Sequence, residues 1–179
     1  MPLIKERPST IEDIYDLPEG HRAELIDGTM YDLAAPSRLH QKISMFLSHV
    51  ISSHIDSKGM DCDVYAAPFA VFLNDDDYNY VEPDISVICD KDKLSDRGCE
   101  GAPDWIIEIV SPSSQQMDYL LKLNKYRASG VRLYWIVDPD LGTVMVHDFE
   151  QDVMERYKFT DSVPVRICEG FEIRLGDLE

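Results

Sequence analysis

The most constraining feature of this chain is a six-residue apolar run that contains one carboxylate. Residues 105–110 have the sequence WIIEIV and are bounded by Pro103 and Pro112. A short run of this kind, rich in β-branched residues, is typical of a central strand that is covered on both faces of a sheet. Glu108 is therefore expected in the interior, where a carboxylate must be protonated, matched with a cation or bound to a metal.

Length and composition indicate one domain that spans residues 1–179. The chain has 179 residues, of which 44% are hydrophobic, enough for a single sizeable core. Residues 1–10 have no apolar signal-peptide segment, and no stretch is long enough to span a membrane, so we expect a soluble, cytoplasmic protein. The four cysteines show no C-x-x-C spacing. We therefore expect reduced, structural thiols, with neither a zinc site nor a disulfide.

The net charge of −17 argues against a general nucleic-acid coat protein, because phosphate binding normally uses a basic surface. One segment differs from this average. Between Tyr119 and Val137 there is no acidic residue, whereas four basic residues are present: Lys122, Lys125, Arg127 and Arg132. This basic island predicts either a local contact with nucleic acid or only the usual preference for cations near the end of a helix. The sequence leaves both open.

The order of elements predicts an α/β fold. Apolar spacing and capping residues predict helices at 11–15, 37–55 and about 113–129. Strands are predicted as a hairpin at 23–26 and 30–33, then at 63–73, 85–88, 105–110, 134–137 and 144–146, with antiparallel edge strands from about 157 to 175. This order is typical of a central mixed sheet flanked by helices, with an extra N-terminal hairpin and C-terminal antiparallel strands. The chain lacks the common signatures of dinucleotide, P-loop, serine hydrolase and zinc protease sites.

Two carboxylates could meet at one end of this sheet. The two-residue period of a strand places Glu108 on the same face as Asp104 and Ile106, and Asp84 opens the preceding strand. If the two strands are neighbours, Asp84 and Glu108 can hold Mg²⁺ or Mn²⁺ through oxygen, with water completing the shell. Taken alone, an Asp after Pro83 is more often a turn residue.

The following helix offers a cation. Asp118, Lys122 and Tyr126 are spaced i, i+4, i+8 and share one face. Lys122 could point toward Glu108, where it could orient or deprotonate a metal-bound water and offset charge on a phosphoryl oxygen. On spacing alone, an exposed Asp118–Lys122 pair worth a few tenths of a kcal/mol is the favoured interpretation.

Two further polar residues have simpler interpretations. Glu24 in the hairpin could pair with Arg22 or with a lysine across the hairpin, and this role is favoured over one in the site. His40 near the start of a helix is more often a surface or capping residue than a ligand.

Four motifs together resemble the Uma family of restriction endonuclease-like proteins, a part of the PD-(D/E)XK nuclease superfamily. They are Pro83-Asp84, the segment EIVSPS at 108–113, the spaced set Asp118, Lys122 and Tyr126, and GVRLYWIVDP at 130–139. The resemblance extends upstream to ELIDG at 24–28 and to His40-Gln41, and it covers about residues 10–175.

The resemblance implies a restriction-endonuclease-like fold and a metal site. It makes Asp84 and Glu108 the metal ligands for Mg²⁺ or Mn²⁺. The superfamily's lysine ordinarily follows the second acid by two residues, where this chain has Val110, and Lys122 matches the position to which the Uma family displaces it. Glu24, which matches a glutamate of the family's hairpin, is a secondary candidate for the metal site. Tyr126 and His40 match family positions whose roles the sequence does not give.

The implied function is a Mg²⁺-dependent DNA endonuclease in which Asp84, Glu108 and Lys122 are catalytic. Lys122 would assist the attacking water, and Lys125, Arg127 and Arg132 are candidate contacts to DNA. Nucleases of this superfamily often act as dimers, which makes a homodimer a candidate assembly.

One residue departs from the family pattern, because Leu133 stands where the family usually has glutamate. This departure and the acidic charge favour an alternative, a catalytically degenerate nuclease-fold domain that serves as a binding or assembly module. A hydrolase of small phosphate esters is a third hypothesis without a motif of its own.

Overall fold

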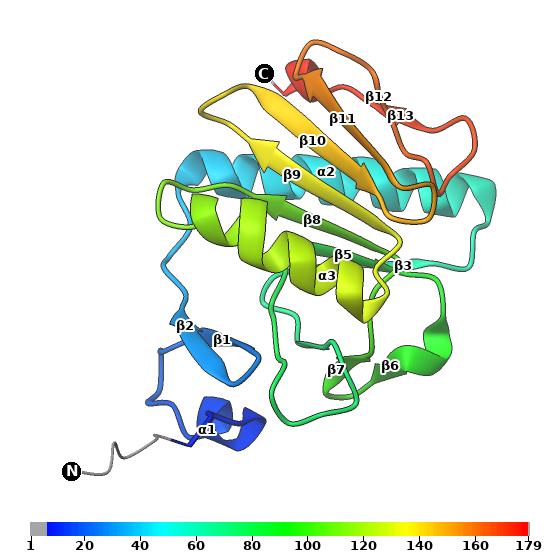
Figure 1. The fold of residues 1–179 in the computed structure, drawn as a ribbon. Helices are drawn as coiled ribbons and strands as arrows, with labels where there is room; N and C mark the ends of the chain where they lie inside the picture. The colour runs from blue at the N-terminus through cyan, green and yellow to red at the C-terminus, as the bar shows by residue number, and fades with distance from the viewer. Residues whose placement is uncertain (1–6, 179) are drawn as a thin grey trace.

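The computed structural model describes residues 7–178 and is built on a six-stranded mixed sheet (Figure 1). Residues 1–6 lie outside the described residues. The prediction that residues 1–10 contain no signal peptide falls partly on them. The strands, in spatial order, are β11 (Val153–Lys158), β10 (Thr143–Asp148), β9 (Leu133–Asp138), β8 (Trp105–Ile109), β5 (Ile85–Ile88) and β3 (Asp63–Ala66). β8 and β9 are parallel, and the other neighbours are antiparallel. The predicted α/β class with a central mixed sheet is confirmed.

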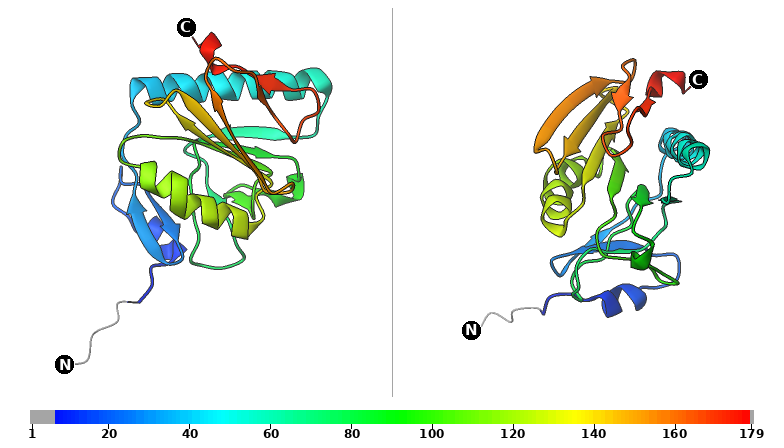
Figure 2. Two further views of the ribbon diagram at one scale, coloured as in Figure 1. Left: turned by 45° about the horizontal axis from the view of Figure 1, so that its top comes forward. Right: turned by 90° about the vertical axis from the view of Figure 1, so that its right-hand side faces the viewer.

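Helices cover both faces of this sheet. Figure 2 shows α2 (Arg38–Lys58) on one side and α3 (Leu123–Ser129) on the other. α3 continues directly from a π-helix, η2 (Met117–Lys122), which the sequence pattern did not predict. α2 is one amphipathic helix that begins at the capping residue Ser37 and ends at Gly59, whose φ of 59° lies in the left-handed region that glycine favours.

The remaining elements are short. The N-terminal part contains α1 (Ile11–Tyr15) and the predicted hairpin of β1 (Ala23–Ile26) and β2 (Thr29–Asp32). A three-stranded sheet joins β4 (Val71–Phe72), β7 (Gly98–Glu100) and β6 (Leu94–Ser95). The 3-10 turn η1 (Lys91–Lys93) leads directly into β6. The C-terminal segment contains β12 (Val163–Pro164), β13 (Glu172–Ile173) and η3 (Leu175–Asp177). None of the described helices has both the length and the apolar character that crossing a bilayer requires.

The hairpin is attached to the segment that leads into β5. Leu25 and Tyr80 exchange two backbone hydrogen bonds, with N–O distances of 2.7 and 2.8 Å. This antiparallel bridge fixes β1 beside residues 80–84, although the two segments are more than 50 residues apart in the chain. The hairpin therefore forms one wall of the region where Asp84 lies.

The prediction of four reduced cysteines is wrong for two of them. Cys62 and Cys89 form a disulfide, whereas Cys99 and Cys168 are buried thiols. Cys62 precedes β3 and Cys89 follows β5, next to the antiparallel pair Asp63 and Ile88. The strand register makes the two cysteines opposite neighbours, which their spacing in the sequence does not reveal.

Candidate active site

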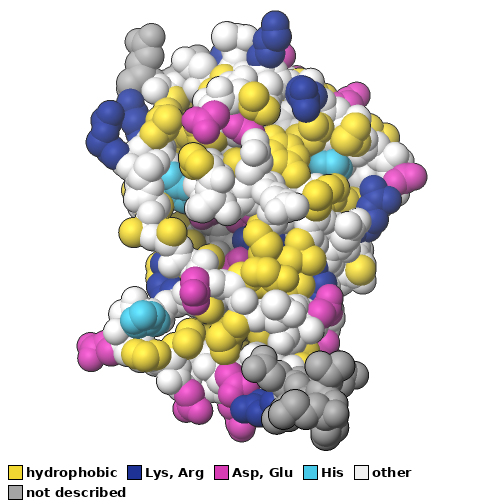
Figure 3. Space-filling model, turned by 60° about the vertical axis from the view of Figure 1, so that its left-hand side comes forward, with side chains coloured by type: hydrophobic (Ala, Val, Ile, Leu, Met, Phe, Trp, Pro, Cys, Tyr) yellow, Lys and Arg dark blue, Asp and Glu magenta, His cyan; other side chains and the backbone are white. Residues whose placement is uncertain are grey.

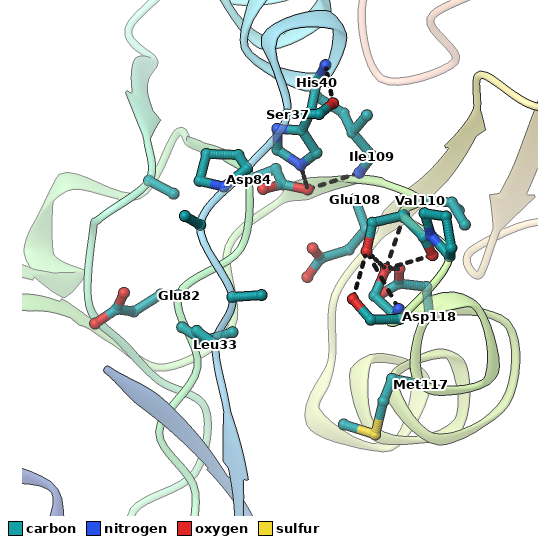
Figure 4. Close-up of a pocket in the computed structure, with 18 of the residues that line it drawn as sticks. Leu33, Ser37, His40, Glu82, Asp84, Glu108, Ile109, Val110, Met117 and Asp118 are labelled. Carbon is teal, nitrogen blue, oxygen red and sulfur yellow. Dashed lines mark hydrogen bonds and ion pairs between the residues drawn. The ribbon is translucent and has the colours of Figure 1, made fainter. Parts of the chain in front are cut away.

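Asp84 and Glu108 lie at the same end of two neighbouring strands. β5 and β8 are antiparallel with Ile85 opposite Ile107, so that Asp84, just before β5, comes beside the last residues of β8. The backbone N–H of Ile109 donates a hydrogen bond of 2.7 Å to Asp84 Oδ2. Figure 4 shows both carboxylates at this end of the sheet. The two strands are thus neighbours, as the metal-site hypothesis requires.

Glu108 is held by a cation and a hydroxyl group. Its side chain is buried with the residue 3% exposed, and Oε1 accepts hydrogen bonds from Lys122 Nζ at 2.9 Å and from Tyr126 Oη at 2.6 Å. Burial raises the pKa of Glu108 well above its usual value, and the Lys122 ammonium opposes that shift. Three other carboxylates add to it: Asp84, Asp118 and Glu24. The sequence allowed a Glu108 that is protonated, paired with a cation or bound to a metal. The structure shows it paired with a cation, the Lys122 ammonium.

Lys122 is the centre of a buried ion network. Its Nζ atom lies 2.8 Å from Glu24 Oε2, 2.9 Å from Glu108 Oε1 and 3.8 Å from Asp118 Oδ1. The residue is only 5% exposed, so the favoured interpretation of an exposed Asp118–Lys122 pair is wrong. Burial lowers the pKa of Lys122, but the surrounding carboxylates outweigh burial and raise it well above the usual lysine value. The side chain is therefore an ammonium.

Glu24 joins the hairpin to this network. It is 1% exposed, and besides Lys122 its Oε1 atom accepts a 3.0 Å hydrogen bond from the backbone N–H of Glu82. The expected pair of Glu24 with Arg22 or a lysine across the hairpin is wrong, because Arg22 binds Glu82 and Lys122 comes from the distant η2 helix. Packing of β1 against residues 80–82 turns Glu24 inward.

His40 is placed against the first carboxylate. Its Nε2 atom lies 3.1 Å from Asp84 Oδ2, and its side chain is mostly buried. Burial lowers the pKa of His40, but the hydrogen bond and charge of Asp84 outweigh this effect and raise it above the usual value. The surface or capping interpretation is wrong for the side chain, since only the backbone N–H of His40 joins the cap, at Ser37 Oγ.

Asp118 is a member of the network that the sequence interpretation missed. It is 1% exposed, and its Oδ2 atom accepts a 2.6 Å hydrogen bond from Ser114 Oγ. Burial raises the pKa of Asp118 to about 6, although Lys122 and the Ser114 hydroxyl oppose the shift. The i, i+4 spacing to Lys122 was visible in the sequence, but spacing alone cannot tell a buried pair from an exposed one.

These residues form the floor of a cleft of about 490 Å³. The hairpin and residues 32–41 line one side, and residues 109–114 with η2 line the other. Figure 3 shows the hollow, with charged side chains inside it. Its lining is acidic: seven carboxylates (Glu24, Asp32, Glu82, Asp84, Glu108, Asp118 and Asp140) against the cations Arg22 and Lys122.

The rest of the basic island lies away from this cleft. None of the three candidate DNA contacts Lys125, Arg127 and Arg132 lines it. Each is paired with an acid: Lys125 with Asp27 at 2.6 Å, Arg127 with Asp152 at 3.1 Å, and Arg132 with Glu150 at 2.8 Å. Among the four basic residues of the island, Lys122 alone lines the cleft. Arg132 also binds Asp104, at the opposite end of β8 from Glu108.

Leu133 belongs to the opposite face of the sheet. It is fully buried in the apolar cluster that includes Trp105 and Trp135, whereas Tyr134 belongs to the cluster on the α3 side. Leu133 and Tyr134 therefore face opposite sides of the sheet. The departure from the family pattern at this position therefore concerns packing under α2.

The donor set fits a divalent cation held by two carboxylates. Within residues 7–178, no group of three or more His, Cys, Asp or Glu side chains is spaced to hold a metal. The hydrogen bonds between described residues use Asp84 Oδ2 and Glu108 Oε1 and leave Asp84 Oδ1 and Glu108 Oε2 available. Mg²⁺ commonly binds one or two carboxylates and keeps several waters. Three carboxylates surround the single Lys122 ammonium, so the positive charge of a divalent cation would offset the remaining negative charge.

Comparisons with known proteins show the family and the fold of this chain. Residues 11–176 match the family model Uma2, described as "Putative restriction endonuclease". A crystal structure of "a putative nuclease belonging to DUF820" from Anabaena variabilis superposes with a TM-score of 0.77 and 26% sequence identity, over 96% of this chain and 97% of that one. The uncharacterized protein slr1290 of Synechocystis is 30% identical over 95 residues, which are 53% of this chain and 48% of that protein. The matched segment thus spans about half the length of this relative.

Proposed function

Because the chain belongs to the Uma2 family of restriction endonuclease-like proteins, we propose that it hydrolyses phosphodiester bonds in DNA with Mg²⁺ or Mn²⁺ as cofactor. The observation that carries this proposal is the placement of Asp84, just before β5, and Glu108, on the adjacent strand β8, in the lining of the same cleft. Each has one oxygen fixed by protein groups and a second oxygen that can bind a cation.

In this proposal, Asp84 and Glu108 hold the cation. A bound divalent cation offsets charge on the phosphoryl group and makes a bound water more acidic. His40 and the Ile109 N–H orient Asp84 through Oδ2. Lys122 and Tyr126 orient Glu108 through Oε1, so that Oε2 would be available to hold the cation.

Lys122 has a narrower role in the proposal than the sequence allowed. An ammonium that three carboxylates surround keeps its protons, so Lys122 offsets negative charge and positions Glu108 but does not deprotonate water. Glu24 holds the ammonium from the opposite side and is bonded to the backbone of Glu82, two residues before Asp84. The hairpin thereby sets the separation between the lysine and the first metal ligand.

The test is cleavage of supercoiled plasmid and of branched DNA with Mg²⁺, with Mn²⁺ and with EDTA. We expect metal-dependent nicking that falls to background in Asp84→Asn, Glu108→Gln and Lys122→Met. Asp140→Asn is the matched control, because Asp140 also lines the cleft but makes no contact in the network. Persistent cleavage in all three site variants would reject the assignment.

The charge of the cleft favours a second candidate function, a nuclease-fold domain that binds a partner without cleaving DNA. Seven carboxylates line the cleft, and the three basic residues expected to contact DNA are paired with acids elsewhere. Titration calorimetry with Mn²⁺ separates the two candidates. A nuclease should bind Mn²⁺ and lose that binding in Asp84→Asn, whereas a degenerate site should bind none.

A further inference from the structure

Asp118 carries a carboxylate oxygen that is buried beside the cleft and accepts no hydrogen bond from the described residues. Its Oδ1 atom accepts no hydrogen bond from any described residue, although Asp118 lines the cleft floor with Lys122 and Glu108. The nearest cation, Lys122 Nζ, is 3.8 Å away, beyond hydrogen-bond distance. Buried polar atoms are almost always paired, so an unpaired carboxylate oxygen in a polar cleft marks a place for a water or substrate group.

The rest of Asp118 is firmly held. Ser114 Oγ donates to Oδ2 at 2.6 Å, the Asp118 N–H donates to the Ser114 carbonyl at 2.9 Å, and Tyr134 Oη donates to the Asp118 carbonyl at 3.0 Å. In Figure 4 Asp118 lies on the same wall of the cleft as Glu108, close to the 110–114 loop. One oxygen is thus anchored, and the other lies buried at the cleft wall without a hydrogen bond.

The charged side chains nearest to Asp118 at the cleft floor are already engaged with other groups. Lys122 is a protonated ammonium directed at Glu24 and Glu108. Asp84 and Glu108 are the proposed metal ligands. His40 points its Nε2 atom at Asp84, whose charge favours the imidazolium.

We propose that Asp118 is the general base of the reaction, a role that rests on the proposed phosphodiester hydrolysis. Asp118 Oδ1 accepts one proton from the attacking water while the water oxygen forms a bond to phosphorus. The P–O ester bond breaks, its electron pair leaves with the departing oxygen, and that oxygen takes a proton from solvent. Asp118 then returns its proton to solvent. A positioned general base typically contributes about 10²- to 10⁴-fold to the rate.

The surroundings of Asp118 suit this role at neutral pH. Burial raises its pKa to about 6, close to the operating pH at which a base is most effective. The titratable and charged groups that face it are Lys122 of η2, Glu24 of β1, Asp84 before β5, Glu108 of β8 and His40 of α2. The ionised form is favoured by Lys122 and by the Ser114 hydroxyl.

The experiment combines cleavage kinetics with measurements on the metal-free protein. We expect Asp118→Ala to lower kcat by about 10²- to 10⁴-fold, with unchanged Mn²⁺ affinity by calorimetry. Formate or azide should restore part of its activity, since a small anion can occupy the vacated position and accept the proton. Carbon-13 NMR of the metal-free wild type should show one aspartate carboxyl, absent from Asp118→Asn, that titrates at a pKa of about 6.

Ser114→Ala supplies a second, milder variant. Loss of its hydroxyl should raise the pKa of Asp118 and move the acidic limb of the kcat profile to higher pH, with retained cleavage at pH 8. A purely structural role for Asp118 would not predict this movement. Asp140→Asn should leave kcat and its pH profile as in the wild type.

The outcomes separate the inference from the proposed function. If the wild type cleaves with Mn²⁺ and Asp118→Ala keeps its kcat, or loses it without rescue by formate or azide, the general-base role is overturned and the nuclease remains. If imidazole rescues His40→Ala while no anion rescues Asp118→Ala, the base is His40. If the wild type itself never cleaves DNA, the proposed function fails first.

Discussion

The two faces of the central sheet are built from alternate residues of the same strands, but one face is an apolar core and the other carries the ion network of the site. On the α2 side, β8 and β9 contribute Ile107, Ile109, Leu133 and Trp135 to an apolar cluster. On the α3 side, Glu108 of the same β8 strand meets the ion network of η2. A single strand therefore supplies both the core that fixes the backbone and the carboxylate that this backbone positions.

Each face of the sheet contains one aromatic pair, and the two pairs differ in their polar groups. Trp105 and Trp135 pack edge to face with centroids 4.9 Å apart, and Tyr126 and Tyr134 do so at 5.0 Å. The packing geometry is similar, but the tyrosines add hydroxyl groups, which bind Glu108 Oε1 and the Asp118 carbonyl. The polar face thus retains aromatic packing and uses the hydroxyls to hold the acids of the site.

The largest effect is expected from Lys122→Met. This change removes the ammonium and leaves three buried carboxylates facing one another, which should lower the free energy of unfolding at pH 7 by about 3–5 kcal/mol. Because burial raises the pKa of Glu108 and Asp118, their protonation relieves the variant as pH falls. Denaturant unfolding should therefore show partial recovery between pH 8 and pH 5. Equal loss at every pH would contradict the account.

Leu133→Glu tests the apolar face with the residue that the family usually carries. In this chain the position is fully buried among Trp105, Trp135 and other apolar side chains, so a carboxylate there should cost about 3 kcal/mol of unfolding free energy. DNA cleavage, measured well below the melting temperature, should not increase. A more active or more stable variant would show that this position acts on the site.

Tyr126→Phe compared with Tyr134→Phe separates the two hydroxyls of the polar face. Tyr126 donates to a carboxylate, and its loss should cost about 2 kcal/mol in chemical denaturation. Tyr134 donates to a neutral carbonyl, so its loss should cost only about 1 kcal/mol. If Tyr134→Phe costs more unfolding free energy than Tyr126→Phe, Glu108 is not the charged acceptor that the network requires.

The smallest effect is expected at the exposed ion pair on the same helix. Arg127→Ala removes the contact to Asp152, in which both side chains are more than half exposed. The unfolding free energy should change by less than about 1 kcal/mol. Because Arg127 does not line the cleft, plasmid cleavage should also stay within about twofold of wild type. A large loss of DNA cleavage would restore Arg127 as a DNA contact.

The sequence predicted the strands of the sheet and the two candidate metal ligands. It did not predict which side chains contact those ligands. The apolar run around Glu108 and the Asp27-Gly28 turn are local patterns, and they correctly located β8 and the hairpin. Spacing on one helix correctly placed Lys122 and Tyr126 on a common face.

Two of the failures concern partners that are distant along the chain. Glu24 meets Lys122 across 98 residues, and Cys62 meets Cys89 through the register of β3 and β5. Burial decided the case of Asp118, because an i, i+4 pair has the same sequence pattern at the surface and in the interior. The ion pairs of the basic island could not be predicted for a similar reason, since the acids that Lys125, Arg127 and Arg132 contact lie elsewhere in the sequence.

Anomalous diffraction from crystals soaked in Mn²⁺ tests the central claim most directly. The account predicts one strong peak at the floor of the cleft, within metal–oxygen bonding distance of Asp84 Oδ1 and Glu108 Oε2, with Lys122 still bound to Glu108 Oε1. The peak should be absent from Asp84→Asn crystals. No peak at this position in the wild type, or a peak that does not touch both carboxylates, would contradict the account.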